Sequence, residues 1–333
     1  MVMRELKILA VVVFFALLTY YGVEPYAHSV MHKDVEGYNF TYDGTADIQE
    51  ATEALEEAQA SGRNVAKAQA RLEVKKAFWS EVDKIAKIPG NVANGQAVFG
   101  TCLACHNGAG VNMGGVIPPN LDHAGALYDK RYLIAVIKDP AMASNVDHKY
   151  ENTMMHPMGS VTAMVSDPQQ IADVVAYMLA KKAGDVTPKA AYEEACARCH
   201  AMRYSKITQL GETPSFTDEK DELAYKIKVL QEQELVEAYM GKLPPDLSMI
   251  IRARSTHFLE TFVENPQSQL EGTSMPRVGL SQAGYDKVHE YLTEIGDPSK
   301  KHREALGPWV IGFFVIFSIL AYLWKKHHWR DLH

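Results

Sequence analysis

Long apolar runs lie at both ends of the chain, while the sequence between them mixes polar and apolar positions. Residues 305–324 carry no formal charge, and 20 helical residues span about 30 Å, the thickness of a bilayer's hydrocarbon core. Tryptophans lie near both ends of this run and lysines follow it, which predicts a transmembrane helix with a cytoplasmic C-terminus. The run at 8–23 is shorter, with 16 uncharged residues and no good cleavage site after it. We therefore expect a retained signal anchor rather than a cleaved signal peptide, and in either case an exported body.

The segment 45–88 favours helix, because Ala, Glu, Gln and Lys dominate it and no proline occurs before Pro89. A Ser-Gly-Arg-Asn string at 61–64 is typical of a turn, so either one long helix or a helical hairpin is expected. We interpret this segment as a spacer or packing element.

Two segments with the same order of features follow. Each has a short helix that leads into a cysteine-containing motif, then a loop and a middle helix, and finally a methionine-containing loop and a closing helix. The closing helices are expected at 167–181 and 282–295, and no strand-like alternation of useful length occurs, so the sequence predicts a mostly α-helical protein. Its expected parts are an anchor at 1–24, a helical linker or hairpin at 25–90, a first domain at 91–184, a second domain at 185–299, and a C-terminal anchor with a cytoplasmic tail at 300–333.

Negative charge is concentrated in the middle of the chain. The net charge is −7 overall; the first 24 residues are neutral and the last 34 carry +4, so the body at 25–299 carries −11. This balance argues against nucleic acid as the main partner, because phosphate contacts need clustered Lys and Arg. It favours encounters with a basic soluble protein instead.

The four cysteines all lie in two Cys-x-x-Cys-His motifs, one in each segment. Two thiols at this spacing can bond the two vinyl groups of one porphyrin, and the adjacent histidine then projects under the ring toward the iron. A redox dithiol would not need the histidine, and a zinc site would need a fourth ligand in each motif. The sequence therefore predicts two covalently bound haem c groups. The attachment residues are Cys102, Cys105 and His106 in the first segment, and Cys196, Cys199 and His200 in the second.

A six-coordinate haem needs a second axial ligand, and a methionine thioether favours the ferrous state. Both segments resemble class I cytochromes c, in which this methionine lies in the loop before the last helix. The resemblance implies Met275, which precedes Pro276 and the second closing helix. In the first segment it implies Met158, with Met155 and His156 as alternatives in the same loop.

Proline pairs follow both motifs. In class I cytochromes c, a proline carbonyl in the loop after the motif accepts the N–H of the ligand histidine, and either Pro118 or Pro119 fits this role. In the second segment, the prolines at 244–245 favour an extended entry, and Asp246 or Ser248 is expected to cap the following helix.

The second segment also resembles cytochrome c1 of the quinol–cytochrome c reductase (cytochrome bc1) complex. The resemblance rests on Cys196-Ala-Arg-Cys-His-Ala-Met-Arg-Tyr204, on Leu243-Pro-Pro-Asp-Leu-Ser248 and on the C-terminal anchor. It implies that Arg254 pairs with a haem propionate, which is a charge-assisted contact. Because another haem segment precedes it, the chain resembles the di-haem cytochrome c1-like subunits of some bacterial reductases.

This resemblance implies an electron-transfer subunit of the bacterial inner membrane, with its haem domains on the periplasmic side and both termini in the cytoplasm. The expected partners are a cytochrome b subunit, a Rieske iron–sulfur protein that supplies single electrons, and a soluble cytochrome c or a terminal oxidase that accepts them. The haems carry the redox chemistry, so no substrate chemistry of the chain's own is expected. Two alternatives stay open, a di-haem subunit of a cbb3-type oxidase and a free-standing membrane-tethered electron shuttle. The C-terminal anchor and the Pro-Pro-Asp-Leu-Ser string favour the reductase.

Overall fold

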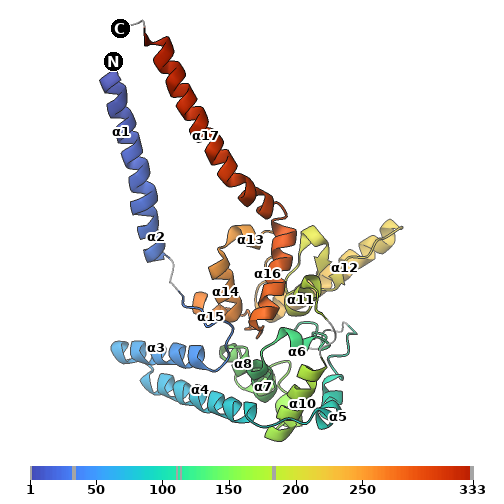
Figure 1. Cartoon of the computed structure of the whole chain (residues 1–333). Helices are drawn as coiled ribbons and strands as arrows, with labels where there is room; N and C mark the ends of the chain where they lie inside the picture. The colour runs from blue at the N-terminus through green and yellow to red at the C-terminus, as the bar shows by residue number, and fades with distance from the viewer. Residues whose placement is uncertain (1, 32–34, 110–111, 113–114, 182–184, 331–333) are drawn as a thin grey trace.

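Figure 1 shows a computed structural model of the chain, which describes residues 2–31, 35–109, 112, 115–181 and 185–330. The N-terminal helix consists of α1 (Val2–Leu18), a π-helical turn (Thr19–Val23) and α2 (Glu24–Met31), and the C-terminal helix is α17 (Lys300–His328). Both contain a span long and apolar enough to cross a membrane, and neither span is buried against the rest of the chain. The N-terminal helix continues beyond the expected boundary at residue 24.

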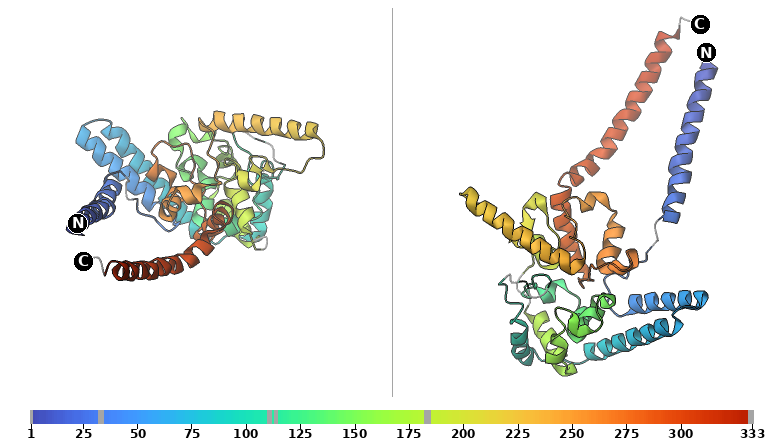
Figure 2. Two further views of the ribbon diagram at one scale, coloured as in Figure 1. Left: turned by 90° about the horizontal axis from the view of Figure 1, so that it is seen from above. Right: turned by 180° about the vertical axis from the view of Figure 1, so that it is seen from behind.

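The two terminal helices extend from the same side of the body, and the described ends of the chain lie close together (Figures 1 and 2). This arrangement is consistent with two membrane anchors whose free ends lie on one side of the membrane. The two Cys-x-x-Cys-His motifs lie in the body, beyond the other ends of these helices.

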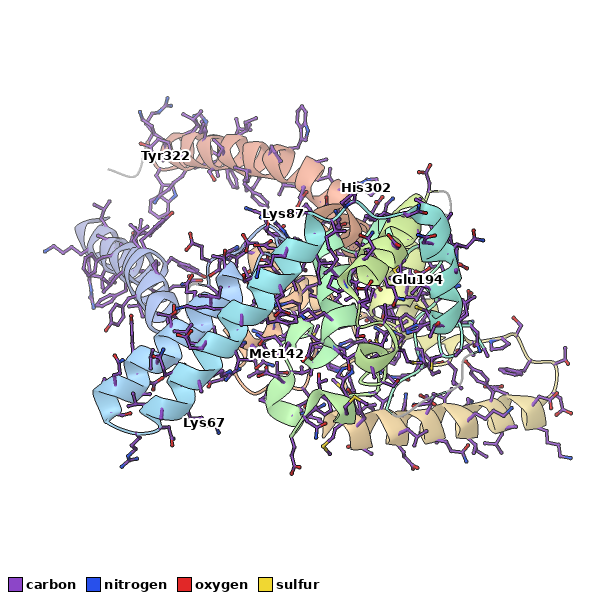
Figure 3. The ribbon with its side chains drawn as sticks, turned by 90° about the horizontal axis from the view of Figure 1, so that it is seen from below. Lys67, Lys87, Met142, Glu194, His302 and Tyr322 are labelled. Atoms are coloured by element: carbon purple, nitrogen blue, oxygen red, sulfur yellow. The ribbon has the colours of Figure 1, made fainter. Side chains whose placement is uncertain are left out.

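The expected turn at 61–64 is confirmed, because α3 (Thr45–Ser61) and α4 (Val65–Ala86) form a helical hairpin. Gly62 and Asn64 adopt positive φ angles of 68° and 57°, which glycine and asparagine tolerate best. A small apolar cluster joins the two helices, and the second half of α4 enters the main core through residues that include Trp79 and Val82. In Figure 3, Lys67 lies near the free tip of the hairpin and Lys87 lies where α4 joins the body.

The first half of the body is helical throughout its described regular elements. These elements are α5 (Val92–Cys102), α6 (Ala124–Leu127), α7 (Lys130–Lys138), α8 (Pro140–Ala143), 3-10 turns at Asp147–Lys149 and Thr153–Met155, α9 (Val161–Met164) and α10 (Pro168–Ala180). The closing helix α10 confirms the expectation for 167–181, and Asp167 caps it by accepting the N–H of Gln170.

The second half has a similar plan and one longer insertion. Its elements are α11 (Pro188–Ala195), a 3-10 turn at Arg203–Ser205, β1 (Ile207–Thr208), β2 (Gly211–Glu212), α12 (Glu219–Met240), α13 (Ile250–Ala253), α14 (Thr256–Glu264), α15 (Pro266–Gln269) and α16 (Gln282–Gly296). The antiparallel pair of β1 and β2 was not expected, because two-residue strands are too short to produce an alternating pattern. The helix α12 extends away from the body (Figures 1 and 2).

Matching elements occur at matching places in the two halves. The helix before each motif packs on the closing helix, with ring centroids 5.1 Å apart for Phe99 and Tyr177 and 5.3 Å apart for Tyr192 and Tyr291. The middle helices α7 and α14 have nine residues each, and each is followed by Asp-Pro or Asn-Pro and a four-residue helix. The order of features read from the sequence therefore corresponds to a repeated order of helices.

The two halves nevertheless share one hydrophobic core, which contains buried residues from both. Main-chain hydrogen bonds join them directly: the N–H of Asp129 donates to Gly279 at 3.0 Å, and the N–H of Ser281 donates to Leu127 at 2.8 Å. A hydrogen bond between the ring of His123 and the carboxyl group of Glu194, the latter labelled inside the body in Figure 3, adds a polar link. The loop before the second closing helix is thus packed against the first half.

Candidate functional site

Both Cys-x-x-Cys-His motifs adopt the same turn at the end of a helix. The main-chain N–H of His106 donates to the carbonyl of Cys102 at 2.9 Å, and the N–H of His200 donates to the carbonyl of Cys196 at the same distance. The helix α5 ends at Cys102, and α11 ends at Ala195, one residue before the second motif. All four cysteines are free thiols, so each motif presents two sulfurs for thioether bonds on one turn.

Each motif histidine is oriented by a proline carbonyl. Nδ1 of His106 lies 2.8 Å from the carbonyl oxygen of Pro119, and Nδ1 of His200 lies 2.8 Å from that of Pro245. A carbonyl oxygen only accepts, so Nδ1 carries the proton in both rings and Nε2 keeps its lone pair for a metal. Burial lowers the pKa of both imidazoles, which favours the neutral form that binds iron. Of the two prolines left open in the first loop, Pro119 is the partner.

The role of Pro245 was missed in the sequence, although a signal for it exists. Pro-Pro-Asn-Leu at 118–121 recurs as Pro-Pro-Asp-Leu at 244–247, and the second proline binds the histidine in both strings. Both strings also form the same turn, in which the Asn120 or Asp246 side chain accepts the N–H two residues later at 3.0 Å. Comparing the two strings would have pointed to Pro245.

The expected helix cap at Asp246 or Ser248 was wrong. The helix α13 begins at Ile250 without a side-chain cap. Asp246 instead accepts the main-chain N–H of Arg203 at 2.9 Å, and the hydroxyl of Ser248 accepts that of Tyr204 at 3.2 Å. Both side chains therefore tie the proline string to the segment that follows the second motif.

The candidate axial methionines lie in the loops expected for them. Met155 is 58% exposed, whereas Met158 is half-buried. The N–H of Met158 donates to Nδ1 of His156 at 3.0 Å, which leaves that ring with its proton on Nε2 and makes it a poorer metal ligand than its sequence position suggests. Met275 is half-buried, and its N–H donates to the hydroxyl of Thr273 at 3.3 Å.

Arg254, which the resemblance pairs with a haem propionate, and its neighbour Arg252 lie at the surface. The guanidinium of Arg254 is exposed and lies 4.8 Å from the ring centre of Phe258. Arg252 forms an ion pair with Asp297 at 2.9 Å. A haem propionate would have to compete with water for Arg254, so its role remains a prediction.

A third arginine, Arg198, fits an anion better. It lies inside the second motif, and after burial its positive charge adds to the lowering of the pKa of His106 in the first motif. Its Nε atom is buried and has no hydrogen-bond partner within the described ranges. Because an unsatisfied buried donor is costly, an acceptor such as a haem propionate would suit this position. A charged residue between two cysteines was the signal available in the sequence.

Together the two sites offer the groups that haem c requires. Each provides two thiols, an imidazole whose Nε2 is not used by the proline contact, and a methionine-containing loop in the same half, and Arg198 adds an unused donor for a carboxylate. The end of α12 contacts the first half of the body: Nζ of Lys149 donates to the carbonyl of Tyr239 at 3.1 Å, and the hydroxyls of Tyr150 and Tyr239 lie 2.5 Å apart. The residues present therefore fit two haem groups.

Comparisons with known proteins agree with this chemistry. The family model for cytochrome c matches residues 92–182. The chain is similar to cytochrome c1 of Allochromatium vinosum, with 25% identity over 201 positions that cover 41% of this chain and 80% of that protein. It is also similar to a protein of Nitrosomonas europaea named ammonia monooxygenase gamma subunit, with 24% identity over 190 positions that cover 43% of this chain and 80% of that protein. No solved structure matches the chain significantly. The chain thus contains a cytochrome c domain, which implies covalently bound haem c, and is cytochrome c1-like.

Proposed function

We propose that the chain is the di-haem cytochrome c subunit of a membrane quinol–cytochrome c oxidoreductase. It would relay single electrons from a Rieske iron–sulfur subunit to a soluble cytochrome c or a terminal oxidase. The observation that carries the proposal is the repeated site: two Cys-x-x-Cys-His turns whose histidines donate Nδ1–H to equivalent proline carbonyls at 2.8 Å. We accordingly treat 91–184 and 185–299 as two cytochrome c-type domains.

Haem iron supplies one-electron redox chemistry when bound, and the protein sets its attachment, ligands and surroundings. In each domain the two cysteine thiols would hold the porphyrin covalently, and the histidine, whose Nδ1 is held by the proline carbonyl, would offer Nε2 as a ligand. Met158 and Met275 are the proposed second ligands, because thioether sulfur favours the reduced state and raises the potential. Two arginines, Arg198 with its buried Nε and the exposed Arg254, would neutralise the negative charge of the haem propionates.

The membrane arrangement follows from the two terminal helices. We place them in the inner membrane of a bacterium, with the haem domains on the periplasmic side and both termini in the cytoplasm. At the junction of body and anchor, Arg303 on α17 donates to both oxygens of Asp297 at 2.6 and 2.8 Å, and Arg252 donates to the same carboxylate. This cluster would hold the second domain close to the membrane, where a cytochrome b subunit and a Rieske protein would lie.

Purification of the full chain in mild detergent tests the proposal. Intact-mass measurement of the denatured protein should show two haems, and replacing Cys196 and Cys199 by Ser should remove one of them and leave the other. Cytochrome b and a Rieske protein should co-purify. One haem per wild-type chain, or bound zinc instead, would overturn the di-haem assignment. Oxidase subunits that co-purify without cytochrome b and a Rieske protein would overturn the assignment to a reductase.

A further inference from the structure

A buried ion pair joins the N-terminal hairpin to the loop that contains Met275. Asp47 on α3 is 1% exposed and Arg277 is 3% exposed, and Nη1 of Arg277 donates to Oδ2 of Asp47 at 3.2 Å while Nη2 donates to Oδ1. Nε1 of Trp79 on α4 donates to the same Oδ2 at 2.8 Å. Both helices of the hairpin therefore fix the carboxylate that holds Arg277.

A second buried contact lies beside the first one. Nζ of Lys75 on α4 donates to Oδ1 of Asn145 at 2.9 Å, and both residues are 1% exposed. The amide of Asn145 in turn donates to Glu50 on α3 and to Asn265, each at 3.0 Å. Buried polar contacts thus attach the hairpin to both halves of the body.

The main chain of Arg277 is also held on both sides. Its N–H donates to the carbonyl of Ser144 at 2.9 Å, and its carbonyl accepts the hydroxyl of Tyr132 at 2.8 Å. Pro276, whose ring restricts φ, is the single residue between Arg277 and Met275. Fixing Arg277 therefore restricts where the side chain of Met275 can point.

The energetics suggest a role other than stability for this pair. Desolvating two charges often costs as much as their attraction returns, and apolar residues of similar size stabilise such positions equally well. A bidentate pair between Arg and Asp instead fixes geometry, because the planar guanidinium matches the carboxylate in one orientation.

We propose that the α3–α4 hairpin is the positioning element of the second haem site, in which Asp47, oriented by Trp79, acts through Arg277 to hold Met275 against the iron. This rests on the proposed role of Met275 as an axial ligand. Asp47 and Trp79 lie on the hairpin, about 200 positions or more before Met275, and act on it through Arg277. They are therefore positioning residues, and the hairpin is more than a spacer.

Three variants of the full-length holoprotein test this inference. Asp47→Asn removes the ion pair, and Trp79→Phe removes one hydrogen bond and keeps the pair. The control Asp83→Asn breaks an exposed ion pair between hairpin and body that involves the first half, in which Nε of Arg131 lies 3.2 Å from Oδ1 of Asp83. Haem content, the redox titration of each haem, and the ferric charge-transfer band of iron bound to thioether are measured in detergent.

Asp47→Asn and Trp79→Phe should keep two haems per chain, lower the midpoint potential of one haem and weaken part of the charge-transfer band. Added imidazole should displace the thioether of that haem at a concentration lower by about tenfold, which corresponds to the lower end of the free energy of one hydrogen bond to a charged group. Asp83→Asn should behave as wild type. Trp79→Phe keeps the test readable where Asp47→Asn fails to fold, because it leaves no buried charge unpaired.

Met275→Leu separates the two levels of the argument. A changed potential in Met275→Leu together with wild-type behaviour in both Asp47→Asn and Trp79→Phe would overturn the positioning role and leave the proposed function standing. An unchanged potential in Met275→Leu would overturn the ligand assignment itself, and the positioning inference with it.

Discussion

Gly279 lies where the loop that follows Met275 crosses α7 of the first half, and its replacement by alanine should destabilise the protein strongly. Its φ angle is +74°, in the left-handed region that favours glycine. A Cβ built there would lie 1.9 Å from Cδ1 and 2.0 Å from Cγ of Tyr132. The ring of Tyr132 cannot move aside easily, because its hydroxyl donates to the main-chain carbonyl of Arg277 at 2.8 Å and the ring centres of Tyr132 and Tyr42 lie 5.5 Å apart.

Two costs add at this position. An L-residue in the left-handed region costs about 1–2 kcal/mol. Forcing an extra methyl into a packed interior costs about 1–3 kcal/mol more. Gly279→Ala should therefore lower the free energy of unfolding by about 2–5 kcal/mol. Gly211 is the matched control: its φ is +96°, and a Cβ there would meet nothing within 4 Å, so Gly211→Ala should show the first cost alone.

Urea unfolding of the detergent-solubilised holoprotein, followed by far-UV circular dichroism, measures both variants against wild type. Equal slopes with different midpoints would allow the midpoints to be read as stability differences. The free energy of unfolding should fall more in Gly279→Ala than in Gly211→Ala. Equal losses would mean that the loop does not press on Tyr132, and the packing between the halves would then be wrong.

Redox potential, pH and ionic strength give further tests. Met275→His should keep both haems attached and lower the midpoint potential of one. Each drop of about 59 mV equals about 1.4 kcal/mol of lost ferrous stabilisation. An unchanged redox titration would indicate that another residue is the ligand, with the buried Met202 as the next candidate. Burial raises the pKa of Glu264, so the stability gained from its protonated form is full below about pH 4 and falls as the pH rises through the raised pKa. Glu264→Gln should remove this pH dependence of the free energy of unfolding, measured in urea between about pH 4 and 8. Hydrogen bonds from Arg303 hold the pKa of Asp297 well below its usual range, so its contribution is full above about pH 4 and is lost as the pH falls; Asp297→Asn should remove that acid-side loss in thermal melts. Electron transfer to a basic soluble cytochrome should slow as ionic strength rises, because the acidic body attracts it, and a salt-independent rate in stopped flow would favour direct transfer to an oxidase.

Several features of this protein were determined by the sequence alone. The two Cys-x-x-Cys-His motifs, the apolar ends, the mostly helical composition and the hairpin turn at 61–64 all depend on residues within a few positions of one another. Such features are set by helical hydrogen bonds, by turn residues such as Gly62 and by side-chain spacing along one helix, so a local pattern is enough to predict them.

Other features were decided only by the tertiary structure. The choice of Pro245 as the partner of His200 spans 45 positions, and the pair of Asp47 and Arg277 spans 230. The surface position of Arg254, and the burial of Nε of Arg198 in the second motif, likewise depend on how the two halves share one core. The physical reason is that a buried polar group must find a partner wherever the packed chain brings one, and that partner is fixed by the fold as a whole and not by neighbours in sequence.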